Sequence, residues 1–100
     1  MEKTIWKFKL ETTEIQEIEM PMYAEILCVQ TQNEIPCLWA LVDPTAEKEI
    51  RHFEVFGTGH PIEQDHPYRR NYIGTYQLCG GDFVLHVFEY TKGKLKPIPV

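Results

Sequence analysis

Apolar side chains recur at every second residue through most of this chain, and this period of two limits its fold more than any other feature. Near the N-terminus, Trp6 and Phe8 share one face of an extended segment, whereas Lys7 and Lys9 lie on the other face. The period of 3.6 residues that marks an amphipathic helix is almost absent. The pattern predicts a mostly β fold of six to seven antiparallel strands, built as a compact sandwich or small barrel with at most one short helix.

Turn-forming residues divide the chain into the expected strands. These strands are predicted at residues 4–10, 14–20, 24–32, 37–43, 47–56, 72–78 and 83–90. The second segment would also suit a short helix, although Pro21 would end it. Hairpin turns are predicted at residues 32–34 and at Gly80-Gly81, where glycine permits a positive φ. The longest segment without a strand pattern is residues 57–71, and loops beyond about 12 residues are usually functional or disordered.

The chain of 100 residues supports one core and leaves no room for a second domain. We expect a single β-rich domain over residues 1–90 and an extended tail over residues 91–100, where lysine and proline recur. Two predicted strands, residues 37–43 and 83–90, carry apolar side chains on both faces. Since an antiparallel sheet with one wet face alternates polar and apolar residues, both faces should be covered, by a second sheet, by the tail or by another copy of the chain. The candidate interface residues for a homo-oligomer, with a dimer favoured, are Trp39, His86, Phe88 and Tyr90.

The charge balance is acidic, with a net charge of −5 and most of the acids in the first half of the chain. A negative protein is poorly suited to general binding of duplex DNA, because that affinity comes from neutralising phosphates. Three cysteines without a CxxC spacing indicate neither a disulfide framework nor a zinc site. The sequence shows no signal-peptide core and no apolar run of membrane-spanning length. We therefore expect a cytoplasmic protein with no membrane partner.

Two polar segments are candidates for a ligand site. In the run Gly57-Thr58-Gly59-His60-Pro61, the glycines let backbone N–H groups approach an anion, and the His60 ring can donate or accept a hydrogen bond. Further along, Arg69 and Arg70 combine guanidinium donors with the ring of Tyr72. The two segments would form one pocket rim if the chain between them folded back. The candidate ligand-binding residues are Gly57, Thr58, Gly59, His60, Arg69, Arg70 and Tyr72.

Each segment also has a purely structural interpretation. Residues 57–61 would serve as a turn in which the glycines meet a backbone requirement and His60 caps the turn. Arg69 and Arg70 would form a solvated basic turn that balances Glu63 and Asp65. The sequence alone leaves these interpretations open beside the functional ones.

No catalytic constellation is recognisable. The chain has no serine, and a pairing of Cys79 with His60 or His86 has no third residue to orient it. The spacing of His52, His60 and His66 matches no compact metal-ligand motif. We expect no enzymatic activity, no metal and no cofactor.

Four strings carry a resemblance to known proteins. They are residues 37–44 (CLWALVDP), 56–62 (FGTGHPI), 72–76 (YIGTY) and 86–89 (HVFE). Together they resemble a family of small proteins encoded by bacteriophages and prophages, whose domain has no assigned function. The similarity runs from the first strand to Glu89, whereas residues 66–70 and the tail depart from it. The resemblance implies a viral or prophage gene product that acts in the cytoplasm of a bacterial host, and it supplies no catalytic residue.

These observations favour a non-catalytic, phage-type accessory binding protein that counteracts host defence. Its partner would be a small anionic or nucleotide-like ligand, or a host protein, held by the segment from Gly57 to Tyr72. One alternative is a protein inhibitor of a host factor that uses the acidic strand surface. Another is a structural or assembly component of a phage.

Overall fold

The alternating pattern folds into seven strands in the computed structural model of the chain, which describes residues 2–64 and 68–91. The strands are β1 (Thr4–Lys9), β2 (Ile15–Pro21), β3 (Glu25–Gln32), β4 (Ile35–Val42), β5 (Lys48–Gly57), β6 (Arg70–Leu78) and β7 (Phe83–Tyr90). The helical structure in the described part of the chain is a single 3-10 turn, η1 (Cys79–Gly81). The predicted mostly β class is therefore confirmed.

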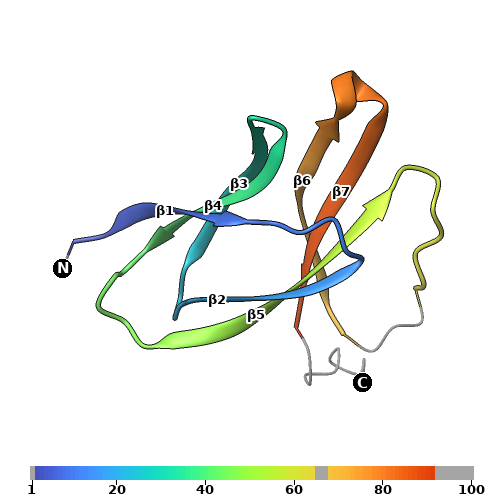
Figure 1. Cartoon of the computed structure of the whole chain (residues 1–100). Coiled ribbons are helices and arrows are strands. Elements are labelled where there is room, and N and C mark those ends of the chain that lie inside the picture. Colours follow the sequence, from blue (N-terminus) through green and yellow to red (C-terminus); the bar gives the residue numbers. More distant parts are fainter. Residues whose placement is uncertain (1, 65–67, 92–100) are drawn as a thin grey trace, which may run out of the picture.

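The strands form two antiparallel sheets (Figure 1). One sheet has the strand order β1-β4-β3 and the other has the order β2-β5-β7-β6. The chain passes from the first sheet to the second through residues 10–14 and again through residues 43–47. This topology brings β5, β7 and β6 side by side, which places residues near positions 56, 72 and 86 on neighbouring strands.

The core lies between the inner faces of the two sheets. Leu38, Ala40 and Val42 project from β4, and Phe53 and Val87 project from the opposing sheet. All five side chains are completely buried. Replacing Phe53 by alanine would cost about 3–5 kcal/mol, because the lost apolar contacts and the resulting cavity both destabilise the fold.

The segment that also suited a helix is a strand. β2 pairs with β5 from Ile15 opposite Glu54 to Pro21 opposite Lys48. The Gln16 side chain helps to close the connection before it, because its amide accepts from the Glu11 N–H at 2.9 Å and donates to the Glu11 carbonyl at 2.8 Å. The pairing of this segment with β5 therefore selects the strand over the helix, although the local sequence pattern allowed both.

Both predicted hairpin turns are present. Asn33 and Glu34 have φ values of 52° and 63°, the two positive values that a two-residue type I′ turn requires. Cys79, Gly80 and Gly81 also have positive φ values, so the chain reverses within η1. The tips of the two hairpins are joined, since the Cys79 N–H donates to the Glu34 carboxylate at 2.8 Å.

The strands with two apolar faces are covered on the inner side by the opposing sheet. On the outer face of β4, Cys37 is only 2% exposed and Trp39 is half-buried beneath the Lys7 ammonium group. On the outer face of β7, the ring of Tyr68 lies 6.1 Å from that of Tyr90. Part of the long segment between β5 and β6 thus covers the second face of β7, while a covering copy of the chain stays a prediction.

The predicted tail, residues 91–100, lies outside the described residues except for Thr91. The Thr91 N–H donates to the Arg69 carbonyl at 3.0 Å and extends the β6–β7 pairing by one step. Within the described ranges, the structure contains no helix that is long and apolar enough to cross a membrane.

Candidate functional site

A line of hydrogen-bonded side chains crosses the outer face of β5, β7 and β6. The hydroxyl of Thr58, just after β5, lies 2.7 Å from Nε2 of His86. The Thr75 hydroxyl lies 2.9 Å from Nδ1 of the same ring and also bonds the Tyr72 hydroxyl. Three of the predicted residues, Thr58, Tyr72 and His86, are therefore brought together, and Thr75 joins them.

This line fixes the His86 ring in place. Each ring nitrogen lies within hydrogen-bond distance of a hydroxyl group, so in the neutral ring one nitrogen donates to a hydroxyl and the other accepts from one. A nucleophile activated by histidine usually needs a third group that stabilises the charged ring, and Thr75 carries no charge. These hydrogen bonds link side chains from β6, from β7 and from the end of β5 on the outer face of the sheet.

Aromatic rings lie next to this line on the same face. The rings of Phe56 and Tyr72 each contact Phe88 edge-on, at centroid distances of 5.8 and 5.3 Å. The Arg70 guanidinium carbon lies 5.8 Å from the centre of the Phe56 ring. Phe56 and Phe88 are half-buried and Tyr72 is exposed, so only one edge of this cluster meets solvent.

Arg70 is occupied by protein groups. Its Nε donates to a Glu54 carboxylate oxygen at 2.7 Å, and its Nη1 donates to the Glu63 carbonyl at 2.6 Å. The Glu54 charge offsets that of Arg70, which reduces the attraction of this site for an anion. Arg69, in contrast, is exposed.

Gly57, Thr58 and His60 line a pocket of about 350 Å³ at the other end of the sheet, and Gly59 is not among its lining residues. The pocket is lined by Gly57, Thr58, His60, Asp82, Phe83, Val84 and Leu85. The His60 ring packs against the Gly57 backbone so closely that a Cβ at Gly57 would lie 2.9 Å from His60 Cε1. A side chain at position 57 would therefore displace the exposed His60 ring.

The backbone of this loop is largely satisfied by the protein itself. The Thr58 N–H donates to the Val84 carbonyl at 3.2 Å, and the His60 N–H donates to the Gly57 carbonyl at 3.1 Å. Two of the N–H groups that would cradle a phosphate are thus already used. The loop meets the β6–β7 turn, and neither Arg69 nor Arg70 is among the residues that line its pocket.

Sequence reasoning missed the pocket residues that come from the β6–β7 turn. Phe83 is 58% exposed, as are several other large apolar side chains among the described residues. Its position directly after the Gly80-Gly81-Asp82 turn was visible in the sequence. What the sequence did not show is that β5 ends beside the start of β7, where Gly57 pairs with Leu85.

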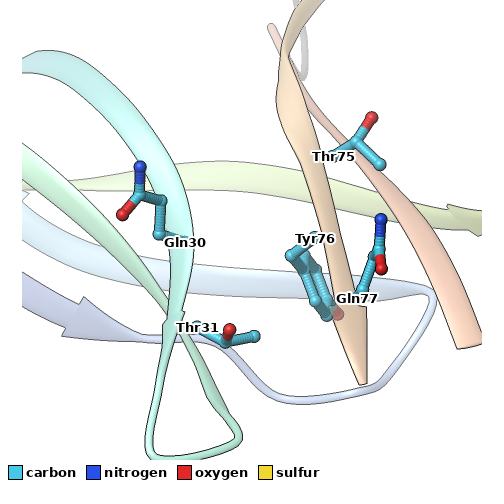
Figure 2. Close-up of a pocket in the computed structure, with 5 residues that line it drawn as sticks. All are labelled: Gln30, Thr31, Thr75, Tyr76 and Gln77. Carbon is cyan, nitrogen blue, oxygen red and sulfur yellow. The ribbon is translucent and has the colours of Figure 1, made fainter. Parts of the chain in front are cut away.

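A second pocket, of about 230 Å³, lies where the edges of β3 and β6 meet (Figure 2). It is lined by the uncharged residues Gln30, Thr31, Thr75, Tyr76 and Gln77. Tyr76 is only 3% exposed, and its hydroxyl has no hydrogen-bond partner among the described residues. Burial raises the pKa of this phenol.

The remaining candidates lie apart from these sites. Trp39 belongs to the other sheet, so it does not share a face with His86, Phe88 and Tyr90. Nδ1 of His52 lies 3.6 Å from a Glu17 carboxylate oxygen, and His66 lies outside the described residues. Among the residues that the structure describes, no three histidine, cysteine or acidic side chains are grouped to hold a metal ion.

The fold and the site define a small antiparallel β protein with two sheets and a mostly apolar surface pocket at one end. The chain belongs to the family of the domain of unknown function DUF7352, whose model matches residues 1–96. No curated protein and no solved structure matches the chain. A domain family without an assigned function is thus found as expected, and its match extends past Glu89, where the similarity was expected to end.

Proposed function

We propose that this protein is a non-catalytic binding protein that holds a nucleotide-like ligand in the pocket between His60 and Phe83. The observation that carries the proposal is this pocket, where an exposed phenyl ring and an imidazole line the same space of about 350 Å³. Pockets for small ligands usually begin at about 300 Å³ and combine apolar walls with a few polar groups. A single nucleobase fits such a volume.

The chemistry of the lining favours a flat heteroaromatic ring. Phe83 offers a face on which a base can stack, an interaction of about 1–3 kcal/mol per base. Asp82 is among the lining residues, and its carboxylate would accept hydrogen bonds from ring N–H or amino groups. The walls formed by Val84 and Leu85 exclude water from the rest of the ring.

The base contributes more to the proposed affinity than the phosphate does. Arg70 is neutralised by Glu54, and the Thr58 and His60 N–H groups are bonded within the protein. Phosphate groups would extend from the pocket into solvent. We therefore expect nucleosides to bind nearly as well as nucleotides.

A thermal-shift series tests this proposal. Nucleosides, nucleotides and cyclic dinucleotides are compared with inorganic phosphate, and a ligand at 100 times its Kd stabilises the fold by about 2.7 kcal/mol. Phe83→Ala and His60→Ala should abolish the shift, while Ile50→Ala, which removes an exposed side chain elsewhere on β5, should leave it unchanged. The absence of a shift with every base-containing ligand would overturn the proposal.

The biological setting is part of the same proposal. The four strings that resemble bacteriophage and prophage proteins support a phage-type accessory protein that acts in a bacterial cytoplasm against host defence. Removal of a nucleotide signal by binding requires no catalytic group. Expression of this protein in a bacterium whose defence uses such a signal should restore plaque formation by a phage that the defence blocks. Expression of the Phe83→Ala variant should not restore it.

A further inference from the structure

Strands β1 and β2 form an open side of the sandwich. β1 is the last strand of the order β1-β4-β3, and β2 is the last strand of the order β2-β5-β7-β6. Figure 1 shows the two strands following each other through residues 10–14 and running in opposite directions. Within the described residues no further strand pairs with them, so each presents a row of unpaired backbone N–H and C=O groups.

The opposite pair of edges is closed. A Cβ at Gly74 of β6 would lie 2.8 Å from Cγ1 of Val29 of β3, so the two strands touch there. The hydrogen bond from Cys79 to Glu34 joins the hairpin tips beyond that contact. The sandwich is thus sealed on one side and open on the other.

The two open edges carry opposite charges. β1 contains two lysines, Lys7 and Lys9, and no acid, whereas β2 contains two glutamates, Glu17 and Glu19, and no base. All four side chains are exposed on the outer faces of their sheets. Opposite charges on facing strands attract each other, whereas like charges repel.

The core is incompletely covered along the same edges. Trp6 and Phe8 on β1 and Ile18 on β2 face inward and pack against the core, yet they are only partly buried. A surface laid against this side would complete their burial.

We propose that these edges bind a second copy of this chain, with β1 of each copy paired antiparallel with β2 of the other. The two copies are related by a two-fold axis that runs parallel to β1 and β2, midway between the levels of the two sheets. Rotation about this axis places the four-stranded sheet of the second copy at the level of the three-stranded sheet of the first. The rotation leaves the direction of every strand unchanged. The three-stranded sheet of one copy then continues into the four-stranded sheet of the other. Because the two-fold closes on itself, the pairing forms a dimer and no fibre.

The register of this pairing follows from the connection. Lys7 and Glu17 lie five residues before and after Thr12, so Lys7 meets Glu17 of the second copy on the outer face. Trp6 and Ile18 lie six residues before and after Thr12, so they meet on the inner face. The same count places Lys9 opposite Ile15 and Ile5 opposite Glu19. The pairing therefore contains one direct charge pair outside, Lys7 with Glu17, and the apolar pair of Trp6 and Ile18 inside.

Charge reversal tests the proposal independently of the nucleotide pocket. One variant carries Lys7→Glu and Lys9→Glu, and the other carries Glu17→Lys and Glu19→Lys. Sedimentation velocity over a range of concentrations should show a dimer for the unmodified chain and at least a tenfold weaker dimer for each variant. A mixture of the two variants in equal amounts should recover the dimer, because each reversed edge then faces an edge of opposite charge.

A matched control and a second readout complete the experiment. The variant with Glu25→Lys and Glu47→Lys makes the same charge change at exposed positions outside β1 and β2, and it should dimerise normally. Amide hydrogen exchange in β1 and β2 of the unmodified chain should speed up on dilution. A chain that is monomeric at all concentrations, or a mixture of variants that stays monomeric, would overturn the proposal.

Discussion

Arg70 and Glu54 form an ion pair across β7 on the outer face of the four-stranded sheet. Nε of Arg70 lies 2.7 Å from Oε1 of Glu54, and the two side chains are only 15% and 9% exposed. Arg70 belongs to β6 and Glu54 to β5, and β7 lies between these strands. Because Arg70 also bonds the Glu63 carbonyl, this pair holds the segment before β6 against the sheet.

Removal of one partner of this pair should destabilise the protein strongly. Glu54→Gln leaves a buried guanidinium group without its counter-charge, and we expect a loss of about 3 kcal/mol in the free energy of unfolding. The double variant Glu54→Leu, Arg70→Met should recover most of that loss, because neither charge then remains buried.

Urea unfolding curves measure these differences. Glu47→Gln serves as the control, since this exposed glutamate should change stability by less than about 0.5 kcal/mol. A double variant as unstable as Glu54→Gln would show that packing, and not the charge pair, holds this part of the sheet.

The period of two was sufficient to predict the strands, because side chains alternate between core and solvent in any antiparallel sheet. It did not predict which strands are neighbours. Arg70 was therefore expected to face a ligand, although the β5-β7-β6 order places it beside Glu54. In the same way His60 was recognised as a candidate, but its pocket neighbour Phe83 is 23 residues away and meets it only through the β5–β7 pairing.

The close approach of Gly74 to Val29 should make position 74 intolerant of larger residues. Gly74→Ala places its Cβ 2.8 Å from Cγ1 of Val29, so one of the strands must move. We expect a loss of about 1–3 kcal/mol from this overpacking. Val29→Ala in the same chain should remove the clash, so the double variant should be more stable than the sum of the two single losses predicts. Additive losses in chemical denaturation would exclude this contact as the cause.

The turn after β4 should contain an acid of low pKa. The Thr45 hydroxyl donates to the Asp43 carboxylate at 2.7 Å and the Thr45 N–H donates at 3.0 Å, and these bonds lower the pKa of Asp43 below its ordinary value of 3.8. A lowered folded-state pKa stabilises the fold above pH 3.8, and this contribution is lost as the pH falls through the lower value.

Titration of the Asp43 carboxyl carbon by NMR tests this effect. Thr45→Val keeps the backbone donor and removes the hydroxyl, so the pKa of Asp43 should rise toward its ordinary value. Thr13→Val removes a threonine hydroxyl from a different turn and should leave the Asp43 titration unchanged. An Asp43 pKa that is the same in the Thr45→Val variant would contradict the assignment.

Tyr76→Phe should stabilise the protein, because it removes a buried hydroxyl that has no partner among the described residues. The expected gain is about 1 kcal/mol at neutral pH.

The Tyr76→Phe substitution should also change how the stability responds to alkaline pH. Burial raises the pKa of Tyr76 above the ordinary value of 10.0, so the unfolded chain ionises first and the folded chain loses stability as the pH rises above that value. The Phe variant should lose less stability over this range, while Tyr90, whose pKa is also raised by burial, keeps its own contribution in both proteins. Thermal unfolding between neutral pH and pH values above 10.0 measures both effects. A destabilised Phe variant would show that the hydroxyl has a partner, such as an ordered water in the seam between β3 and β6.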